Sequence, residues 1–454
     1  MGGSAKPTRR RVAVIGGGAS GLLTAWMLQD EHDVVVYEAD DRLGGHVHTV
    51  PVEHDDRETV YAEAGFKYFF DRTNPNMRAV FDRLGMAIEW TEAAMTLPHP
   101  RMKGDLVLPP RTARQLALLL TAPAALRDLV CLSTLRLAYD EVVPVGDTRM
   151  TIEELLAWRR FPDAAHPFLY SFISSSWGAP VDVMARFPAY NVLTLLSSPG
   201  ARYKRVGYLP GGSSGYIDAL VGELQRSTLR AGTAVTRIQR RGGAWDVGVG
   251  GDTDRFEAVV LALPAWRAAR ILFGADLWRD ALGVFRRFDA RIAIHHDTSF
   301  MPRKRRDWSL SNVSVRRGRT MLTSWEGLRQ RRDVFRSWLL GDEHPRRLVA
   351  RAEFEHLIVD AQSATDRARL DALQGLDELY AVGMYTGDVD CHESCVTSAL
   401  AVAERLSPQS PLAQRIRRRA AARAADEKEQ HRRTAARLTR PLLARLSTRR
   451  AVST

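Results

Sequence analysis

The stretch that decides the fold is Arg11–Gly21, RVAVIGGGASG, in which a short apolar strand pattern runs directly into a glycine-rich turn. An apolar, helix-like segment follows the turn, and a second apolar strand pattern, Val34–Tyr37, ends at Glu38. Strand, glycine turn, helix, strand and acid in this order are typical of a unit that binds a dinucleotide. We therefore predict that this unit opens the fold and binds such a cofactor.

Each glycine of the turn has its own physical role in this prediction. Gly16 permits the tight turn, Gly18 lets the backbone approach a pyrophosphate, and Gly21 allows the helix to pack closely on the strand. The first residues of the helix, Ala19 and Ser20, offer unpaired N–H groups and the positive end of the helix dipole. Phosphate groups are therefore expected at this turn.

The acid that closes the unit begins a longer motif, Glu38–Gly45, EADDRLGG. Its carboxylate, with Ala39 beside it, is placed to accept hydrogen bonds from a ribose diol. The motif resembles the extended flavoprotein pattern, in which an acid is followed by Arg and a glycine pair. This resemblance implies FAD as the cofactor, with Arg42 near the pyrophosphate and with Gly44 and Gly45 close to the flavin.

The residue after the glycine pair is His46, and the same resemblance implies that it lies beside the flavin ring. A histidine in this place either stays unlinked or carries the flavin covalently, and His48 is the second candidate for such a link. We expect an unlinked histidine. Flavin that stays with the polypeptide after acid precipitation would show the covalent alternative.

Later segments resemble one flavoprotein family. A strand pattern begins near Val235, which would lie by the adenine, and Leu379–Met384, LYAVGM, leads through a loop to a helix pattern at Cys395–Leu406. With the N-terminal motifs, these segments resemble the flavin-containing amine oxidase superfamily. The stretch His295–Asp297, HHD, resembles a bacterial branch of amine-oxidase-like FAD-binding proteins. The resemblance covers most of residues 11–406.

The superfamily resemblance also implies flavin contacts in the last of these segments. The residues expected there are Gly383, Met384, His392, Glu393 and Ser394. The N-terminus of the helix pattern would face the flavin pyrimidine, where the helix dipole stabilises the negative charge of reduced flavin. Many relatives have an acid in place of Met384 and a glycine in place of Ala399, so at these two positions the chain departs from the family pattern that carries the ribityl contacts.

The resemblance implies an α/β fold in which a Rossmann-like FAD-binding domain is interrupted by a mixed α+β substrate domain. We assign residues 1–70, 205–290 and 375–410 to the FAD-binding domain, 71–204 and 291–374 to the substrate domain, and 411–454 to a basic, Arg- and Ala-rich tail. A helix pattern near the start of the substrate domain has Asn74 as its cap and Gly85 at its end. The later aromatic residues of the first substrate segment form plain core or partly line a hydrophobic substrate cavity.

Charge and composition limit the partners. Residues 411–454 hold 13 Arg and Lys against 3 Asp and Glu, which accounts for most of the formal net charge of +12, so we expect no nucleic-acid partner. Between Ile416 and Leu438 the tail has only alanines as apolar residues. We therefore expect a solvated helix that is dispensable for folding, or else peripheral contact with an acidic membrane or partner.

The cysteine count and the N-terminus bear on the compartment. The chain has 3 cysteines, which suits a reduced compartment, and its first apolar run is too short for a signal peptide. We expect a cytoplasmic protein, with the inner face of the membrane as a place of peripheral contact. A composition with 45% hydrophobic and 26% charged residues excludes a disordered, fibrous or membrane-spanning chain.

The sequence offers few catalytic side chains. We find no nucleophile elbow, no phosphate-binding lysine loop and no metal-ligand cluster, which leaves the flavin as the chemical agent. His295 and Asp297 would share one face of a strand, so that Asp297 orients an acid–base imidazole, or the two form a surface pair without a catalytic role. Lys67, Lys204 and Lys304 are the candidates for the lysine-held water that amine oxidases of this superfamily often place near flavin N5.

These observations predict an FAD-dependent oxidoreductase. It would oxidise or dehydrogenate a mostly hydrophobic small molecule at a C–N or C–C bond, by hydride transfer to flavin N5. Two alternatives stay open. One is a redox-neutral double-bond isomerase of a lipid-like substrate, and the other is a non-catalytic flavoprotein scaffold.

Overall fold

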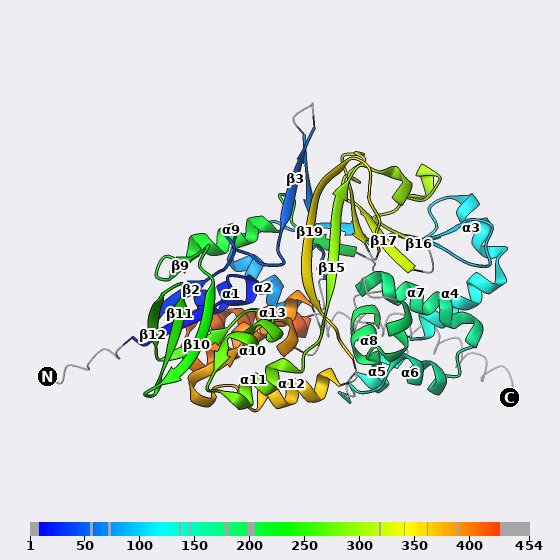
Figure 1. Ribbon diagram of the computed structural model, residues 1–454. Coiled ribbons are helices and arrows are strands. Elements are labelled where there is room, and N and C mark those ends of the chain that lie inside the picture. Colours follow the sequence, from blue (N-terminus) through cyan, green and yellow to red (C-terminus); the bar gives the residue numbers. More distant parts are fainter. Residues whose placement is uncertain are drawn as a thin grey trace, which may run out of the picture.

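The structure is a computed structural model, which describes residues 9–54, 58–70, 74–135, 138–143, 145–146, 148–177, 181–197, 205–316, 319–339, 341–360, 362–387, 389 and 391–426. Lys204 and residues 427–454 of the basic tail lie outside the described residues. The parallel sheet at the N-terminus occupies one end of the molecule, two long strands cross its middle, and a group of helices forms the other end (Figure 1).

A five-stranded parallel sheet organises the FAD-binding part. Its strands, in spatial order, are β20 (Leu379–Ala381), β13 (Ala258–Leu261), β1 (Arg11–Ile15), β2 (Asp33–Tyr37) and β9 (Thr228–Arg230). Apolar runs form these strands because a parallel sheet is buried on both faces. Alternate residues of β1 pack on opposite sides, Val12 and Val14 in one core cluster and Ala13 and Ile15 in another. The predicted strand, turn, helix and strand at the N-terminus are confirmed.

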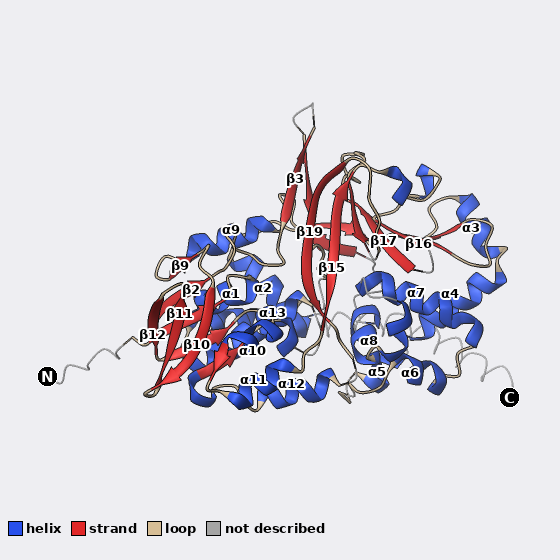
Figure 2. Ribbon diagram, viewed as in Figure 1, coloured by secondary structure: helices blue, strands red, loops and turns tan. Residues whose placement is uncertain are grey.

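Different layers cover the two faces of the parallel sheet (Figure 2). Helices share the core cluster on one face, namely α1 (Ala19–Leu28), α9 (Ser214–Glu223) and α13 (His392–Leu406). A second sheet shares the other cluster, with strands β12 (Asp252–Phe256), β11 (Ala244–Val249), β10 (Val235–Arg241) and β14 (Leu272–Phe273). Helices α10 (Ala265–Ile271), α11 (Asp276–Gly283) and α12 (Ser363–Asp371) complete that side.

A seven-stranded mixed sheet forms the wall between the two ends of the molecule. Its strands, in spatial order, are β19 (Leu348–Leu357), β15 (Arg287–His295), β18 (Phe335–Leu339), β17 (Arg319–Trp325), β16 (Ser311–Arg316), β6 (Met95–Pro98) and β7 (Asp105–Leu108). Strand β15 runs antiparallel to both of its neighbours, β18 and β19. Two short antiparallel pairs lie outside this sheet, β3 (Thr49–Glu53) with β4 (Thr59–Glu63) and β5 (Glu89–Glu92) with β8 (Arg205–Tyr208).

Helices of the first substrate segment lie on the far side of this sheet (Figure 1). They are α3 (Ala113–Leu120), α4 (Pro123–Leu135), α5 (Tyr139–Val142), α6 (Ile152–Trp158), α7 (His166–Trp177) and α8 (Ala189–Ser197). Local sequence begins two of them, because Thr112 with Gln115 and Thr151 with Glu154 form capping boxes. Among the described residues, no single helix has the length and apolarity that a membrane crossing needs. The pair α3 and α4 passes that test only when taken together, across a bend of 92°.

Helix α2 (Pro75–Arg83) forms where the sequence predicts a helix, with Asn74 at the N-cap. The Asn74 side chain does not cap it, however, because its Oδ1 accepts a hydrogen bond from the backbone N–H of Phe70. Met77, together with other apolar residues of α2, packs in the core cluster of α1 and α13. The structure thus places the start of the first substrate segment against the FAD-binding part.

The beginning of the basic tail corrects the expectation of a solvated helix. Residues 411–426 are helical, and three of their side chains are buried in the core cluster of α1 and α13, namely Ala413, Ile416 and Ala420. An ion pair joins Arg423 to Asp82 of α2, and the Ser410 hydroxyl donates to the carbonyl of Met27 at 2.9 Å.

Candidate functional site

The glycine turn has the geometry that its sequence predicts. Gly16 has a φ of +115°, and a Cβ there would stand 2.4 Å from the carbonyl oxygen of Ala262, while a Cβ at Gly21 would stand 2.0 Å from the carbonyl oxygen of Gly16. Gly18 differs, because the nearest atom to its Cβ position is 3.9 Å away, in Gly45. Contacts within the protein thus require glycine at Gly16 and Gly21, whereas Gly18 faces open space where a ligand can approach.

The end of β2 closes this turn. One carboxylate oxygen of Glu38 accepts from the backbone N–H of Gly17 at 2.7 Å, and the other accepts from the backbone N–H of Asp40 at 3.0 Å, across the exposed Ala39. The backbone N–H of Thr233 donates to the carbonyl of Glu38 at 2.7 Å, which brings the start of β10, at Val235, to the same strand end. A carboxylate has about four acceptor positions, so Glu38 keeps capacity for ribose hydroxyls.

Arg42 stabilises the loop that follows. Its guanidinium donates to the carbonyl oxygens of Gly45 at 2.7 Å and Val47 at 2.8 Å. Gly44 pairs with the glycine turn, because its N–H donates to the carbonyl of Gly17 at 2.8 Å. Helix α1 begins beside this pair with no side-chain cap, so the N–H groups at Ala19 and Ser20 remain available to phosphates. Together these residues fit a dinucleotide.

The FAD-binding segments share one large cavity with the seven-stranded sheet. Its volume is about 790 Å³. From the FAD-binding segments it is lined by His46, Phe66, Met384, His392, Glu393 and Ser394, among others. From the helices and the large sheet it is lined by Trp177, Tyr190, Ala290, Ile292, Arg336, Trp338, Phe354 and His356, among others. Six residues were expected near the flavin ring, and all of them except Gly383 line this cavity. Gly383 lies next to it, and its N–H donates to the Ser398 hydroxyl, which belongs to a lining residue.

Two buried histidines lie on the FAD-binding side of the cavity. The imidazole of His46 packs edge-on against Phe354, with ring centroids 4.8 Å apart, and that of His392 stacks on Phe66 at 4.0 Å. Burial lowers the pKa of His46 to about 4 and the pKa of His392 to about 3. Both rings are therefore neutral near pH 7.

Glu393 also lines the cavity, but its carboxylate is engaged with α2. It accepts hydrogen bonds from the backbone N–H groups of Asn76 at 2.8 Å and Met77 at 2.9 Å, and from the side-chain amide of Asn76 at 2.7 Å. Burial raises its pKa. The Ser394 hydroxyl is likewise used within the protein, because it donates to the carbonyl of Val389. Both side chains are thus engaged within the protein, and a flavin contact at these two positions stays a prediction.

The geometry does not bring His295 and Asp297, the residues of the catalytic hypothesis, to the lining of the large cavity. The sheet face of the cavity carries Ala290 and Ile292, whereas His295 lies at the end of β15 among the aromatic rings of another core cluster and is fully buried. Its Nε2 is bonded to the Ser337 hydroxyl at 2.9 Å, and its Nδ1 accepts from the backbone N–H of Asp297 at 3.0 Å. Burial lowers the pKa of His295 to about 4. This is a core histidine.

The Asp297 carboxylate does not orient the imidazole either. It accepts from the backbone N–H groups of Ser299 at 2.9 Å and Arg346 at 2.9 Å, and thereby caps the short 3₁₀ turn Thr298–Phe300. These hydrogen bonds hold the pKa of Asp297 below its usual value, although burial opposes them. The expected shared strand face is not formed, because β15 ends at His295 and Asp297 lies beyond the strand.

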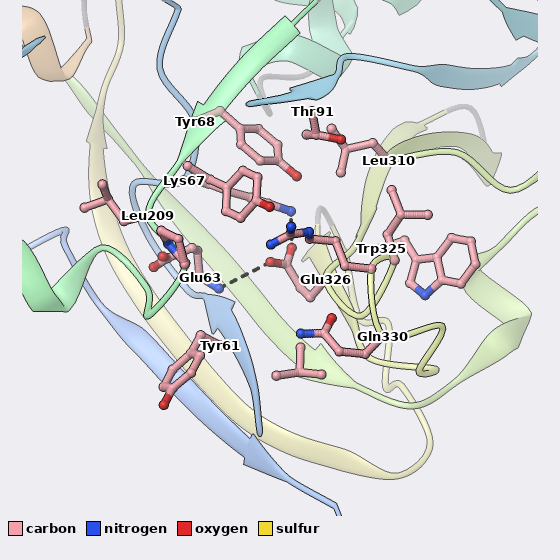
Figure 3. Close-up of a pocket in the computed structure, with 15 residues that line it drawn as sticks. Tyr61, Glu63, Lys67, Tyr68, Thr91, Leu209, Leu310, Trp325, Glu326 and Gln330 are labelled. Carbon is pink, nitrogen blue, oxygen red and sulfur yellow. Dashed lines mark hydrogen bonds and ion pairs between the residues drawn. The ribbon is translucent and has the colours of Figure 1, made fainter. Parts of the chain in front are cut away.

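The two described lysine candidates lie outside the large cavity. Lys304 is exposed. Lys67 borders a smaller cavity of about 80 Å³, where its ammonium forms an ion pair with Glu326 (Figure 3). Glu63 borders the same space, and burial raises its pKa to about 7. Tyr68 lines both cavities, so this buried charged cluster lies directly behind the wall of the large one.

Sequence reasoning did not identify the residues of the large sheet that line the cavity. Ile292 of β15 is in register with Trp338 of β18, and Ala290 with Phe354 of β19. Residues in register share a face, so alternate positions of three strands make one aromatic wall. The alternation in Phe335–Leu339, FRSWL, could have indicated that Arg336 and Trp338 lie together.

Comparisons with known proteins identify the family of the chain. A family model described as flavin containing amine oxidoreductase matches residues 19–310. Carotenoid phi-ring synthase from Streptomyces griseus is 29% identical over 279 residues, which are 58% of this chain and 53% of that protein. The chain thus spans about half the length of this curated relative.

Solved structures share the fold at low sequence identity. The putative protoporphyrinogen oxidase from Exiguobacterium sp. 255-15 has a TM-score of 0.63 and 15% identity, over 88% of this chain and 99% of that one. The CLA-producing fatty acid isomerase from P. acnes has a TM-score of 0.63 and 13% identity, over 90% and 100%. The cyclohexylamine oxidase from Brevibacterium oxydans IH-35A has a TM-score of 0.60 and 14% identity, over 88% and 99%. Because the family match spans more than half of the sequence, the chain belongs to the flavin-containing amine oxidoreductase family, with FAD as its cofactor.

Proposed function

We propose that the protein oxidises or dehydrogenates a mostly hydrophobic small molecule at a C–N or C–C bond. The observation that carries this proposal is the cavity of about 790 Å³ that the FAD-binding segments share with the seven-stranded sheet. When bound, FAD supplies a hydride acceptor at N5. The side chains of the cavity therefore need only to bind the substrate, orient it and exclude water.

The aromatic wall suits an apolar substrate. Trp177 and Tyr190 reach the cavity from α7 and α8, and Trp338 and Phe354 reach it from β18 and β19. Such side chains bury apolar surface and exclude water, which strengthens the few polar contacts inside. Phe168 and Trp177 are both buried in the core, and Trp177 also lines the cavity, as does the half-buried Tyr190.

The two buried histidines on the flavin side are not proton donors near pH 7. His46 and His392 are held neutral by burial, so they supply hydrogen-bonding nitrogens and no positive charge. Helix α13 begins at His392, and its positive dipole end faces the cavity, which favours negative charge there. These residues orient and stabilise, and the substrate itself need not be protonated by them.

Anaerobic titration of the FAD-loaded protein tests this proposal. A panel of hydrophobic amines and unsaturated lipids is mixed with the protein, and flavin absorbance and product are both measured. Lasting bleaching is expected for an oxidase or dehydrogenase. Product without net bleaching would show isomerisation instead, and neither response with any compound would favour a scaffold.

A matched pair of variants connects the response to the cavity. Trp338→Ala removes part of the aromatic wall and is expected to weaken the apparent affinity for a compound that bleaches the flavin. Trp158→Ala changes an exposed tryptophan of α6 and is expected to leave that affinity unchanged. An equal effect of both substitutions would show that the substrate binds elsewhere.

A further inference from the structure

Arg336 is a buried cation on the wall of the large cavity. It lies in β18, only 6% of its surface is exposed, and it faces the cavity together with Trp338. Its register partner in β15 is Ile294, so its aliphatic stem lies over an apolar sheet face. The guanidinium carbon stands 5.2 Å from the centre of the Trp338 ring, which holds the planar group against the aromatic wall.

The hydrogen-bonding capacity of Arg336 is mostly unused. One Nη donates to the carbonyl oxygen of Gly65 at 3.3 Å, and Nε is buried without a partner. Among the residues that the structure describes, no carboxylate lies within the 4.0 Å of an ion pair with this guanidinium. A guanidinium has five N–H donors, and buried donors without partners destabilise a protein. A ligand in the cavity that accepts hydrogen bonds from the Nη groups would use part of this capacity.

The nearest carboxylates have other partners. Glu326 forms the ion pair with Lys67 that Figure 3 shows, and the backbone N–H of Glu63 points to the same carboxylate at 3.5 Å. Glu63 accepts hydrogen bonds from the backbone N–H of Ser213 at 2.6 Å and from the Thr49 hydroxyl at 2.9 Å. These acids moderate the charge of Arg336 at longer range, but they do not occupy its donors.

We propose that Arg336 binds a carboxylate of the substrate, so that the substrate class is a mostly apolar molecule that carries one carboxylate. The proposal rests on the proposed function, because it assigns the same cavity to the substrate. A carboxylate matches the planar guanidinium with two parallel hydrogen bonds, and in an aromatic cavity few waters compete with them. Anchored there, the apolar part of the substrate fills the space between the aromatic wall and the side lined by His46 and His392.

Binding of a matched pair of probes tests the anchor without any turnover. The FAD-loaded protein is titrated with octanoate and with octan-1-ol, which has the same chain length and no charge, and binding is followed by flavin absorbance and by calorimetry. We expect octanoate to bind about 10-fold or more tightly than octan-1-ol, because hydrogen bonds between charged partners contribute strongly in a buried site. Arg336→Gln should remove this preference and leave octan-1-ol binding unchanged. Arg336→Lys should retain part of it.

Arg291→Gln is the control, because Arg291 is an exposed arginine on the neighbouring strand β15 and should keep the preference. Equal binding of both probes to the wild-type protein would overturn the proposal, whatever the variants do. A variant Arg336→Gln that loses FAD but keeps the preference would show that the arginine serves the cofactor alone. If the protein prefers octanoate but no compound bleaches the flavin lastingly, the role of Arg336 is supported and the proposed reaction is overturned. The two failures are therefore distinguishable.

Discussion

Glu393, in the first turn of α13, caps the N-terminus of α2 by accepting a hydrogen bond from the backbone N–H of Met77 at 2.9 Å. The two residues are 316 positions apart in the sequence, so a helix of the first half of the chain is fixed by the last helix of the FAD-binding part. This contact also positions the cavity wall, because Glu393 and its neighbour His392 both line the cavity.

Replacing this cap should lower stability. Glu393→Gln presents an amide group to N–H donors that a carboxylate satisfies, so we expect the free energy of unfolding to fall by about 1–3 kcal/mol. Glu404→Gln is the matched control, because Glu404 is an exposed residue of the same helix, paired with Arg417 at 2.7 Å. Its loss should cost less than about 1 kcal/mol. Urea unfolding of the three proteins measures the difference, and equal losses would contradict the capping role.

His295→Ala should separate stability from activity. The substitution removes a fully buried ring that is bonded to the Ser337 hydroxyl and leaves a cavity in the sheet, so we expect a loss of about 2–4 kcal/mol. Turnover per bound FAD should stay at the wild-type value, because the ring does not line the large cavity. Thermal unfolding and flavin-normalised rates measure the two effects. A large fall in the normalised rate with an unchanged stability would restore the catalytic hypothesis.

Sequence reasoning succeeded where the chemistry is local. The glycine spacing, Glu38 and the strand at Val34–Tyr37 are within a single unit, in which Gly21 is required by its close contact with Gly16 and Gly18 leaves open space for a ligand. The resemblance to amine oxidases extended the prediction to His392, which does meet His46 at the cavity. Cofactor identity and family could therefore be predicted from motifs, which do not depend on how distant elements pack.

The remaining site depends on contacts between distant segments. Glu393 was expected to serve the flavin, but its role as a cap appears only when α2 is brought against α13. The packing of Ile416 was missed because a stripe of alanines gives little amphipathic contrast. For His295, alternation predicted a face shared with Asp297, but β15 ends at His295.

The buried acid Glu63 should make stability depend on pH. Its pKa rises to about 7 in the folded protein, mainly through burial, against an ordinary value of 4.5. A raised pKa means that the folded state binds the proton more tightly. The contribution of Glu63 to the free energy of unfolding is therefore fully present below about pH 4.5 and is lost as the pH rises through about 7. The loss amounts to about 3 kcal/mol at most.

Glu63→Gln removes this titration while keeping an oxygen that can accept from the backbone N–H of Ser213, and its amide NH₂ then faces the Thr49 hydroxyl. We expect the free energy of unfolding of the wild-type protein to fall, relative to that of the variant, between pH 5 and pH 8. Comparing the two proteins at each pH cancels the opposite contribution of His46 and His392, whose lowered pKa values destabilise the fold as the pH falls. Parallel pH profiles would show that the carboxyl of Glu63 does not titrate in this range.

Two glycines of one turn should respond to substitution in opposite ways. A Cβ at Gly18 would meet no protein atom nearer than 3.9 Å, and its φ of −73° suits any residue, so Gly18→Val should fold. The same side chain would occupy the space through which a pyrophosphate approaches α1, so FAD should be lost or bound far more weakly. At Gly21 the Cβ would stand 2.0 Å from the carbonyl oxygen of Gly16, so Gly21→Ala should destabilise the apoprotein itself. Circular dichroism and unfolding of the apoproteins, together with the flavin content after reconstitution, distinguish the two effects. A Gly18→Val protein that retains FAD with wild-type affinity would show that the cofactor does not pass over this turn.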